Sequence, residues 1–136
     1  MKTIIVAAAI VIRDDKVLLT QRKQGAHLEG LWEFPGGKVE PGEDPRVALL
    51  RELGEEVGVD ANIGDIVEVT FHRYHDADKA VLLLFYRADL RPGSPEPRAL
   101  DVAALEWCGV SGLDPGRFPP ADVDVLRKVL TLLRRG

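Results

Sequence analysis

The chain has 136 residues, of which 46% are hydrophobic and 29% charged, with a formal net charge of -4 at pH 7. This length and composition predict one globular domain over residues 1–136 and exclude a disordered chain. The negative balance, without a run of Lys and Arg, argues against binding of long nucleic acid, which needs many phosphate contacts. The single cysteine, Cys108, excludes an internal disulfide and suits a reducing cytoplasm.

The first two apolar segments predict a β-hairpin. Residues 3–12 and 17–21 are rich in β-forming side chains and are separated by the polar residues 13–16. The first segment is too short to span a bilayer, so we expect no membrane association. Arg22 follows the second strand and is a candidate for pairing with phosphate oxygens; its alternative is a solvated loop charge.

Residues 31–35 predict a short strand that leads into the turn at Gly36 and Gly37. Glycine there allows the backbone to approach an ion or a phosphate closely. Phe34 fits either the core or one wall of a slot that stacks on a base. Lys38 fits either the surface or a second phosphate contact.

The next segment predicts a helix. Asp44 can cap its first turn, Pro45 is tolerated at the first helical position, and Gly58 supplies a stop. Helical spacing divides the side chains between two faces. The apolar stripe expected to pack on the core comprises Leu50, Leu53 and Val57. The opposite, acidic face comprises Glu52, Glu55 and Glu56.

This acidic face needs neutralising charge. Glu52 lies three and four residues before Glu55 and Glu56, and like charges at these spacings repel by a few tenths of a kcal/mol. Hard divalent cations such as Mg²⁺ or Mn²⁺ take carboxylate oxygens and fill their remaining positions with water and substrate phosphates. For the three glutamates alone, the alternative is an exposed acidic face without a ligand.

The second half predicts more strands and a final helix. Strands are expected at residues 63–74, 80–90 and 105–108, and the proline-rich residues 91–98 predict a surface loop. A last helix is expected through Arg135. Its apolar residues at packing spacing are Leu126, Val129, Leu130 and Leu133. This order of elements predicts a mixed α/β layered domain.

Residues 37–59 resemble the Nudix box, G-x5-E-x7-R-E-U-x-E-E-x-G-U with U aliphatic. All nine specified positions are filled, by Gly37, Glu43, Arg51, Glu52, Leu53, Glu55, Glu56, Gly58 and Val59. The flanking segments 20–22, 26–27, 33–38 and 118–121 are similar to the MutT subgroup of Nudix hydrolases. Residues 30–34 and 120–122 are also similar to the related CTP pyrophosphohydrolases.

The resemblance implies a fold and a reaction. The fold is an α/β/α sandwich with a mixed sheet, of the α/β (α+β) class. The reaction is Mg²⁺-dependent hydrolysis of a (deoxy)nucleoside triphosphate to the monophosphate and pyrophosphate, which would cleanse the nucleotide pool of 8-oxo-dGTP-like substrates and so support DNA repair. The alternatives are a pyrophosphohydrolase for CTP or a modified pyrimidine triphosphate, and a non-catalytic nucleotide-binding module.

The resemblance also implies roles for individual residues. The metal ligands would be the Gly37 carbonyl, Glu52, Glu55 and Glu56. Glu43 and Arg51 would support the catalytic site, with either Glu52 or Asp101 as the base. Arg22 and Lys38 would bind phosphate. The residues that contact the base would be His27, Phe34 and Asp122.

Two of these assignments have structural alternatives. Asp101 stands where Glu is more usual in the subgroup, and its alternative is capping of a loop. Asp122 stands where MutT-like proteins typically have Asn. An ionised Asp can only accept hydrogen bonds, which suits guanine N1-H and N2-H₂ or the amino group of cytosine; the alternative is the N-cap of the last helix. We expect a cytoplasmic protein that is a monomer or a weak homodimer.

Overall fold

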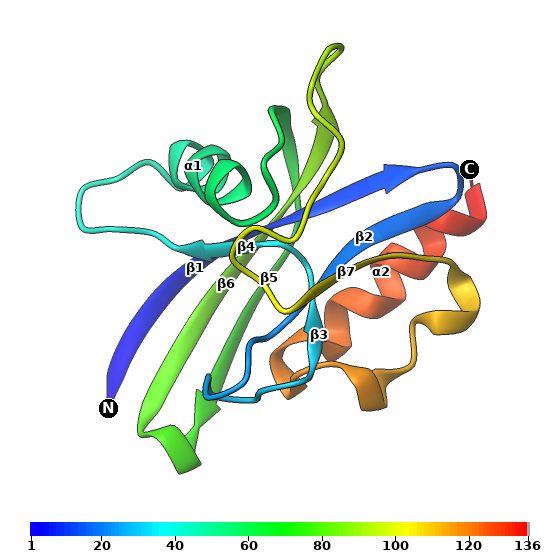
Figure 1. The fold of residues 1–136 in the computed structure, drawn as a ribbon. Coiled ribbons are helices and arrows are strands. Elements are labelled where there is room, and N and C mark those ends of the chain that lie inside the picture. The colour runs from blue at the N-terminus through cyan, green and yellow to red at the C-terminus, as the bar shows by residue number, and fades with distance from the viewer. Residues whose placement is uncertain (136) are drawn as a thin grey trace.

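A seven-stranded mixed sheet forms the middle layer of the computed structural model, which describes residues 1–135 (Figure 1). Its strands are β1 (Lys2–Arg13), β2 (Lys16–Gln21), β3 (Trp32–Glu33), β4 (Gly36–Lys38), β5 (Ala61–Tyr74), β6 (Lys79–Leu90) and β7 (Ala104–Cys108). The main order is β3-β2-β1-β6-β5, with β4 paired to β1 and β7 to β2. β1 and β6 run parallel and the other pairs are antiparallel, which confirms the mixed sheet.

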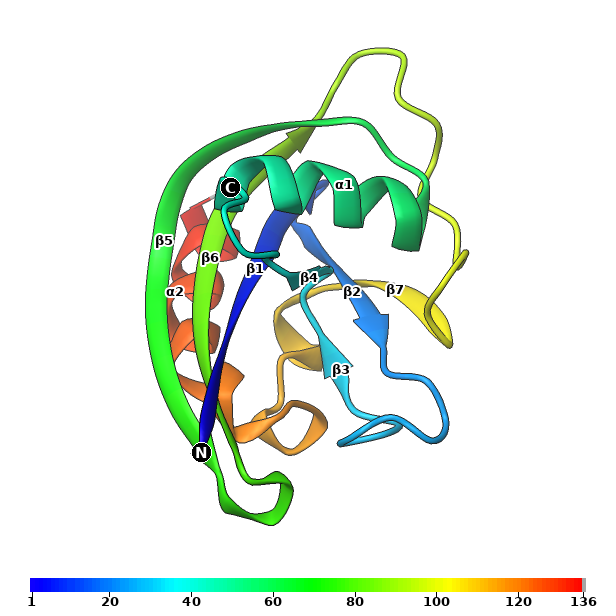
Figure 2. The ribbon, with the colours of Figure 1, turned by 90° about the vertical axis from the view of Figure 1, so that its left-hand side faces the viewer.

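Two helices, α1 (Pro45–Val57) and α2 (Val123–Arg135), lie on opposite faces of this sheet (Figure 2). Successive side chains of a strand point to opposite faces, so β1 contributes to both cores. Ala7, Ala9 and Val11 pack in the α1 layer, whereas Ala8 and Ile10 pack in the α2 layer. The three layers confirm the predicted α/β/α sandwich.

The ends of α1 follow the predicted signals. The Asp44 carboxylate accepts a 2.8 Å hydrogen bond from the main-chain amide of Arg46, and Pro45 occupies the first helical position. Gly58 ends the helix in the left-handed conformation, with a φ of 70° that glycine adopts without a steric penalty. These interactions are local, which explains why both ends of α1 could be predicted from the sequence.

The packing face of α1 differs in part from the prediction. Leu53 and Val57 are fully buried as expected, but Leu50 is 40% exposed and Leu49 is buried instead. Residues 49, 53 and 57 are spaced four apart and stack along one face, whereas residue 50 lies about 100° further round the helix. The prediction that Leu50 packs on the core was therefore wrong.

The remaining elements follow the prediction closely, with one difference. The strands expected in both halves are present, and α2 buries Leu126, Val129 and Leu133 while Leu130 packs at the edge of the same cluster. The turn expected at Gly36 and Gly37 is instead strand β4, paired with β1. A Cβ at Gly36 would overlap the main chain of Ala7, so this close pairing requires glycine.

Within residues 1–135, none of the helices combines the length and the apolar character that crossing a membrane would require.

The difference between Leu53 and Leu50 gives a test of the packing. Leu53→Ala removes a fully buried side chain and should lower the free energy of unfolding by about 2–5 kcal/mol, measured by urea denaturation. Leu50→Ala, on the same helix but 40% exposed, is the matched control and should cost less than about 1 kcal/mol. Equal losses in the two variants would contradict this account of the α1 interface.

Candidate active site

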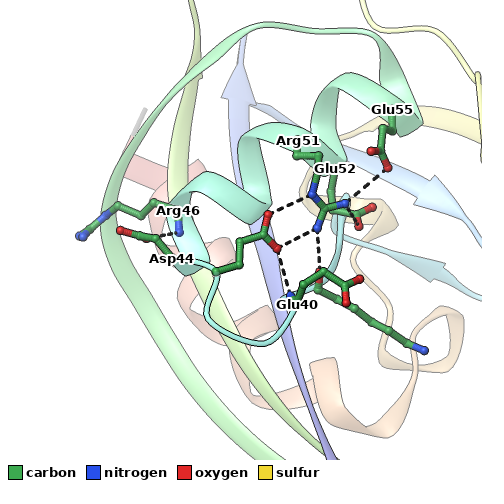
Figure 3. Close-up of polar contacts among 8 residues, drawn as sticks. Glu40, Asp44, Arg46, Arg51, Glu52 and Glu55 are labelled. Atoms are coloured by element: carbon green, nitrogen blue, oxygen red, sulfur yellow. Dashed lines mark hydrogen bonds and ion pairs between the residues drawn. The ribbon is translucent and has the colours of Figure 1, made fainter.

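Arg51 organises the glutamate face of α1. Its guanidinium donates to both carboxylate oxygens of Glu43 at 3.0 Å and to Glu52 at 2.9 Å, and it lies 3.6 Å from Glu55 (Figure 3). These hydrogen bonds raise the pKa of Arg51, and the bond from Arg51 lowers the pKa of Glu43. A further bond to the Lys38 carbonyl, at 3.2 Å, ties the helix to the end of β4. The side chain therefore holds in place a group of carboxylates that would otherwise repel one another.

Glu56 lies in surroundings that oppose its negative charge. Burial, together with the nearby carboxylates of Glu33, Glu52 and Asp101, raises the pKa of Glu56 to about 9. Arg51, which pairs with the other glutamates of α1, makes no hydrogen bond to Glu56. The cluster therefore holds more carboxylates than the neighbouring cation can balance, and an ionised Glu56 needs additional positive charge.

The donor set fits a hard divalent cation. Carboxylate and carbonyl oxygens are the ligands that Mg²⁺ prefers. A Cβ at Gly37 would overlap the Glu52 carboxylate, so glycine lets the β4 main chain lie directly against that side chain. Nowhere in residues 1–135 do three acidic, His or Cys side chains already converge as metal ligands, since Glu52 and Glu55 lie against Arg51. The ligand roles of Gly37, Glu52, Glu55 and Glu56 stay a prediction.

A pocket beside the box gathers most of the other predicted site residues. The predicted residues that line it are Arg22, His27, Phe34, Gly37, Lys38 and Asp122. They come from β4, from the segments on either side of β3, and from the turn before α2. The fold thus places the candidate phosphate and base contacts in one cavity that reaches the Gly37 main chain.

Arg22 is engaged within the protein. Its guanidinium pairs with Glu33 at 3.0 Å and 3.2 Å and donates to the His27 carbonyl at 2.6 Å. Burial raises the pKa of Glu33, an effect that the charge of Arg22 opposes. A phosphate contact from Arg22, which stays a prediction, would therefore be made by a side chain already fixed in orientation.

Lys79 and Tyr74 also line the pocket and were missed by the sequence analysis. Burial and the charges of Arg22 and Lys38 lower the pKa of Lys79, so three cations share this region. The Tyr74 hydroxyl accepts a 3.3 Å hydrogen bond from the Ala121 amide. Tyr74 and Lys79 lie on either side of the turn between β5 and β6. No local sequence pattern indicates that this turn lies near the box.

Phe34 and Asp122 are both buried. The Phe34 ring stacks on Phe118 with centroids 5.8 Å apart and meets the Phe85 ring edge-on, so Phe34 belongs to the core as well as to the pocket wall. Asp122 is only 4% exposed, and burial, with the charge of Glu33, raises its pKa well above the usual value. A protonated carboxyl donates as well as accepts. The sequence alone suggested an ionised Asp122 that only accepts hydrogen bonds. The protonated carboxyl, which burial favours, can also donate one.

Asp101 lies at the edge of the glutamate cluster. Its amide donates to the Glu56 carbonyl at 3.1 Å, and its exposed carboxylate forms an ion pair with Lys23. Its charge contributes to the raised pKa of Glu56. Glu52 and Asp101 both lie close enough to Glu56 to affect its pKa, and both stay candidates for the base.

Comparison with known proteins decides the family. The NUDIX domain model matches residues 3–129. The chain belongs to the Nudix hydrolase family. It is 39% identical to a CTP pyrophosphohydrolase of Escherichia coli over 132 residues, which cover 97% of this chain and 95% of the relative. An 8-oxo-dGTP diphosphatase of the same organism is 34% identical over 133 residues, with 97% and 100% covered.

A solved structure supports the same conclusion. The crystal structure of a MutT NUDIX hydrolase from Burkholderia pseudomallei superposes with a TM-score of 0.80 at 27% identity, covering 96% of this chain and 98% of that one. The resemblance stated from the box is therefore confirmed, and the chain is an enzyme of this family. Nudix hydrolases generally use divalent metal ions, in keeping with the uncompensated carboxylates of this hydrolase.

The raised pKa of Glu56 predicts how stability depends on pH. Because the folded protein binds this proton more tightly than the unfolded chain, stability should fall as pH rises from the usual value of 4.5 toward about 9. In EDTA, the Tm should therefore fall with rising pH, and Glu56→Gln should reduce this slope. At high pH, replacing EDTA with Mg²⁺ should raise the Tm of the wild type, because Mg²⁺ binds the ionised Glu56, but should not raise the Tm of the variant.

The control for this measurement is Glu40→Gln. Glu40 is exposed and lies before α1. This variant should keep the wild-type slope and the response to Mg²⁺. Identical slopes for the wild type and Glu56→Gln would show that the pKa of Glu56 is not raised in the folded protein.

Proposed function

We propose that this Nudix hydrolase cleaves (deoxy)nucleoside triphosphates to the monophosphate and pyrophosphate, with Mg²⁺, or Mn²⁺ in its place, held at the glutamate face. One observation carries the proposal: the pocket that contains the base candidates also reaches Gly37 of the box and three cationic side chains, Arg22, Lys38 and Lys79. A nucleotide bound there would have its base among His27 and Asp122 and its phosphates toward the glutamates. The names of the two Escherichia coli relatives support the same substrate class.

The chemistry follows from charge. A triphosphate repels a nucleophile. A divalent cation held by the Gly37 carbonyl, Glu52, Glu55 and Glu56 would neutralise the phosphates and lower the pKa of a water molecule. Lys38 and Lys79 orient the phosphates, while Glu52 or Asp101 accepts the proton of the attacking water. The water oxygen forms a bond to the β-phosphorus, and the bond from that phosphorus to the oxygen bridging to the α-phosphate breaks. The nucleoside monophosphate keeps the bridging oxygen, and pyrophosphate carries the oxygen of the water. Arg51 keeps Glu52 oriented throughout, since its two hydrogen bonds to Glu43 fix the guanidinium.

The identity of the base depends on the proton of Asp122. An ionised Asp122 accepts from guanine N1-H and N2-H₂, which fits 8-oxo-dGTP and a role in cleansing the nucleotide pool. A protonated Asp122 donates to cytosine N3 and accepts from the N4 amino group, which fits CTP. The burial that raises the pKa of Asp122 favours the protonated form, and with it CTP or a modified pyrimidine triphosphate as a second candidate.

A substrate panel tests the proposal. Turnover of 8-oxo-dGTP, dGTP, CTP and 5-methyl-dCTP with Mg²⁺ should release pyrophosphate from at least one of them, and kcat/KM should rank the two candidate substrates. Glu56→Gln should lower kcat by about 100-fold or more, since loss of a direct metal ligand should exceed the effect of a supporting residue. Glu40→Gln should have no effect.

Two outcomes would count against the proposal. Unchanged turnover in Glu56→Gln would reject the metal assignment. Binding of these nucleotides without pyrophosphate release would favour a non-catalytic module instead.

The Asp122 proton gives a second test. If protonated Asp122 recognises cytosine, the ratio of kcat/KM for CTP to that for dGTP should fall as pH rises through the elevated pKa of Asp122. Asp122→Asn keeps a donor and an acceptor without a titrating proton, so this ratio should become independent of pH. The same pH dependence in the wild type and the variant would show that Asp122 does not select the base.

A further inference from the structure

The loop between β2 and β3 forms one side of the nucleotide pocket. Arg22, His27 and Leu28 of this loop line the cavity. The loop is fixed at its base, where the Arg22 amide donates to the Leu31 carbonyl at 2.9 Å and the Gly30 amide donates to the Arg22 carbonyl at 3.1 Å. Its middle is held at the main chain, where the Arg22 guanidinium donates to the His27 carbonyl at 2.6 Å, so it is the His27 side chain that needs another support.

That support comes from a distant part of the chain. The Nε2 atom of His27 lies 2.8 Å from a carboxylate oxygen of Asp76, a residue of the short 3₁₀ turn between β5 and β6. The loop and this turn lie at the same end of the sheet (Figures 1 and 2). The His27 ring also meets the Tyr74 ring edge-on, with centroids 5.2 Å apart. His27 is therefore held between a carboxylate and an aromatic ring.

Asp76 is suited to act as a fixed acceptor. Its hydrogen bond with His27 lowers the pKa of the Asp76 carboxyl, so this carboxyl stays ionised and makes Nε2 of His27 a donor. Asp76 does not line the pocket, and its side chain is 67% exposed, whereas that of His27 is 23% exposed. Asp76 can therefore act on a bound nucleotide in two ways, through its hydrogen bond to His27 and through its charge, which acts on Lys79 of the pocket.

We infer that Asp76 is a positioning residue that holds His27 in place as a wall of the nucleotide pocket and thereby sets the affinity for the nucleoside part of the substrate. The inference rests on the proposed function. Without the Asp76 carboxylate, the His27 side chain loses the hydrogen bond that fixes its ring, and substrate binding has to order the ring again. This loss acts on the bound substrate and the transition state alike, so it changes KM rather than kcat.

The experiment uses the full chain with CTP and with 8-oxo-dGTP. Asp76→Ala should raise KM about three- to tenfold, as expected when one side chain must be ordered on binding, and leave kcat within about twofold of the wild type. Asp76→Asn retains an acceptor oxygen for Nε2-H and should keep KM near the wild-type value.

The matched control is Asp78→Asn. This substitution removes the same charge from the same turn, and Asn tolerates the left-handed conformation of residue 78, whose φ is 48°. It should leave KM unchanged. An equal rise in KM for all three variants would assign the effect to the charge of the turn and would overturn the inference.

A double-mutant cycle tests whether Asp76 acts through His27. Asp76→Ala should raise KM in the wild-type background but have no further effect in His27→Ala. A KM that does not change in Asp76→Ala, or that rises equally in both backgrounds, would overturn the inference. Failure of the proposed function is recognised separately, because the wild type would then release no pyrophosphate from either nucleotide.

Discussion

The imbalance between one guanidinium and the carboxylates around it is the constraint on which the candidate active site depends. Arg51 holds Glu43 and Glu52 by hydrogen bonds and lies near Glu55, which leaves Glu56 uncompensated with a pKa of about 9. The arrangement is costly for the protein alone because like charges are held close together. A divalent cation bound there would remove that cost and would also supply the positive charge that a polyphosphate needs before water can attack it.

The fold brings the parts of the site together through strand β1. β4 pairs with β1 at Gly37, and α1 packs on the same strand through Leu53 and Val57, so both halves of the box share one rigid support. On its other edge, β1 pairs in parallel with β6, which begins at Lys79. Lys79, which lies far along the chain from Gly37, thus lines the same pocket as Gly37.

The sequence predicted the features that depend on local interactions. The ends of α1 could be located because Asp44, Pro45 and Gly58 act within a few residues of their position. The strands other than β4 could be located from runs of β-forming side chains. The packing of Leu50 was predicted wrongly, since spacing alone does not fix how a helix is rotated on a sheet. Long-range contacts of Tyr74 and Lys79 had no local signal. The raised pKa of Asp122 could not be foreseen either, because it depends on burial beside Glu33.

Direct measurement of cation binding tests the central claim most simply. Mn²⁺ titrated into the protein without nucleotide, with free Mn²⁺ followed by electron paramagnetic resonance, should bind the wild type and Glu40→Gln alike. It should bind Glu56→Gln at least about tenfold more weakly, as expected when a carboxylate ligand is lost. Equal binding by wild type and Glu56→Gln, or no binding by the wild type, would contradict a cation site on the glutamate face.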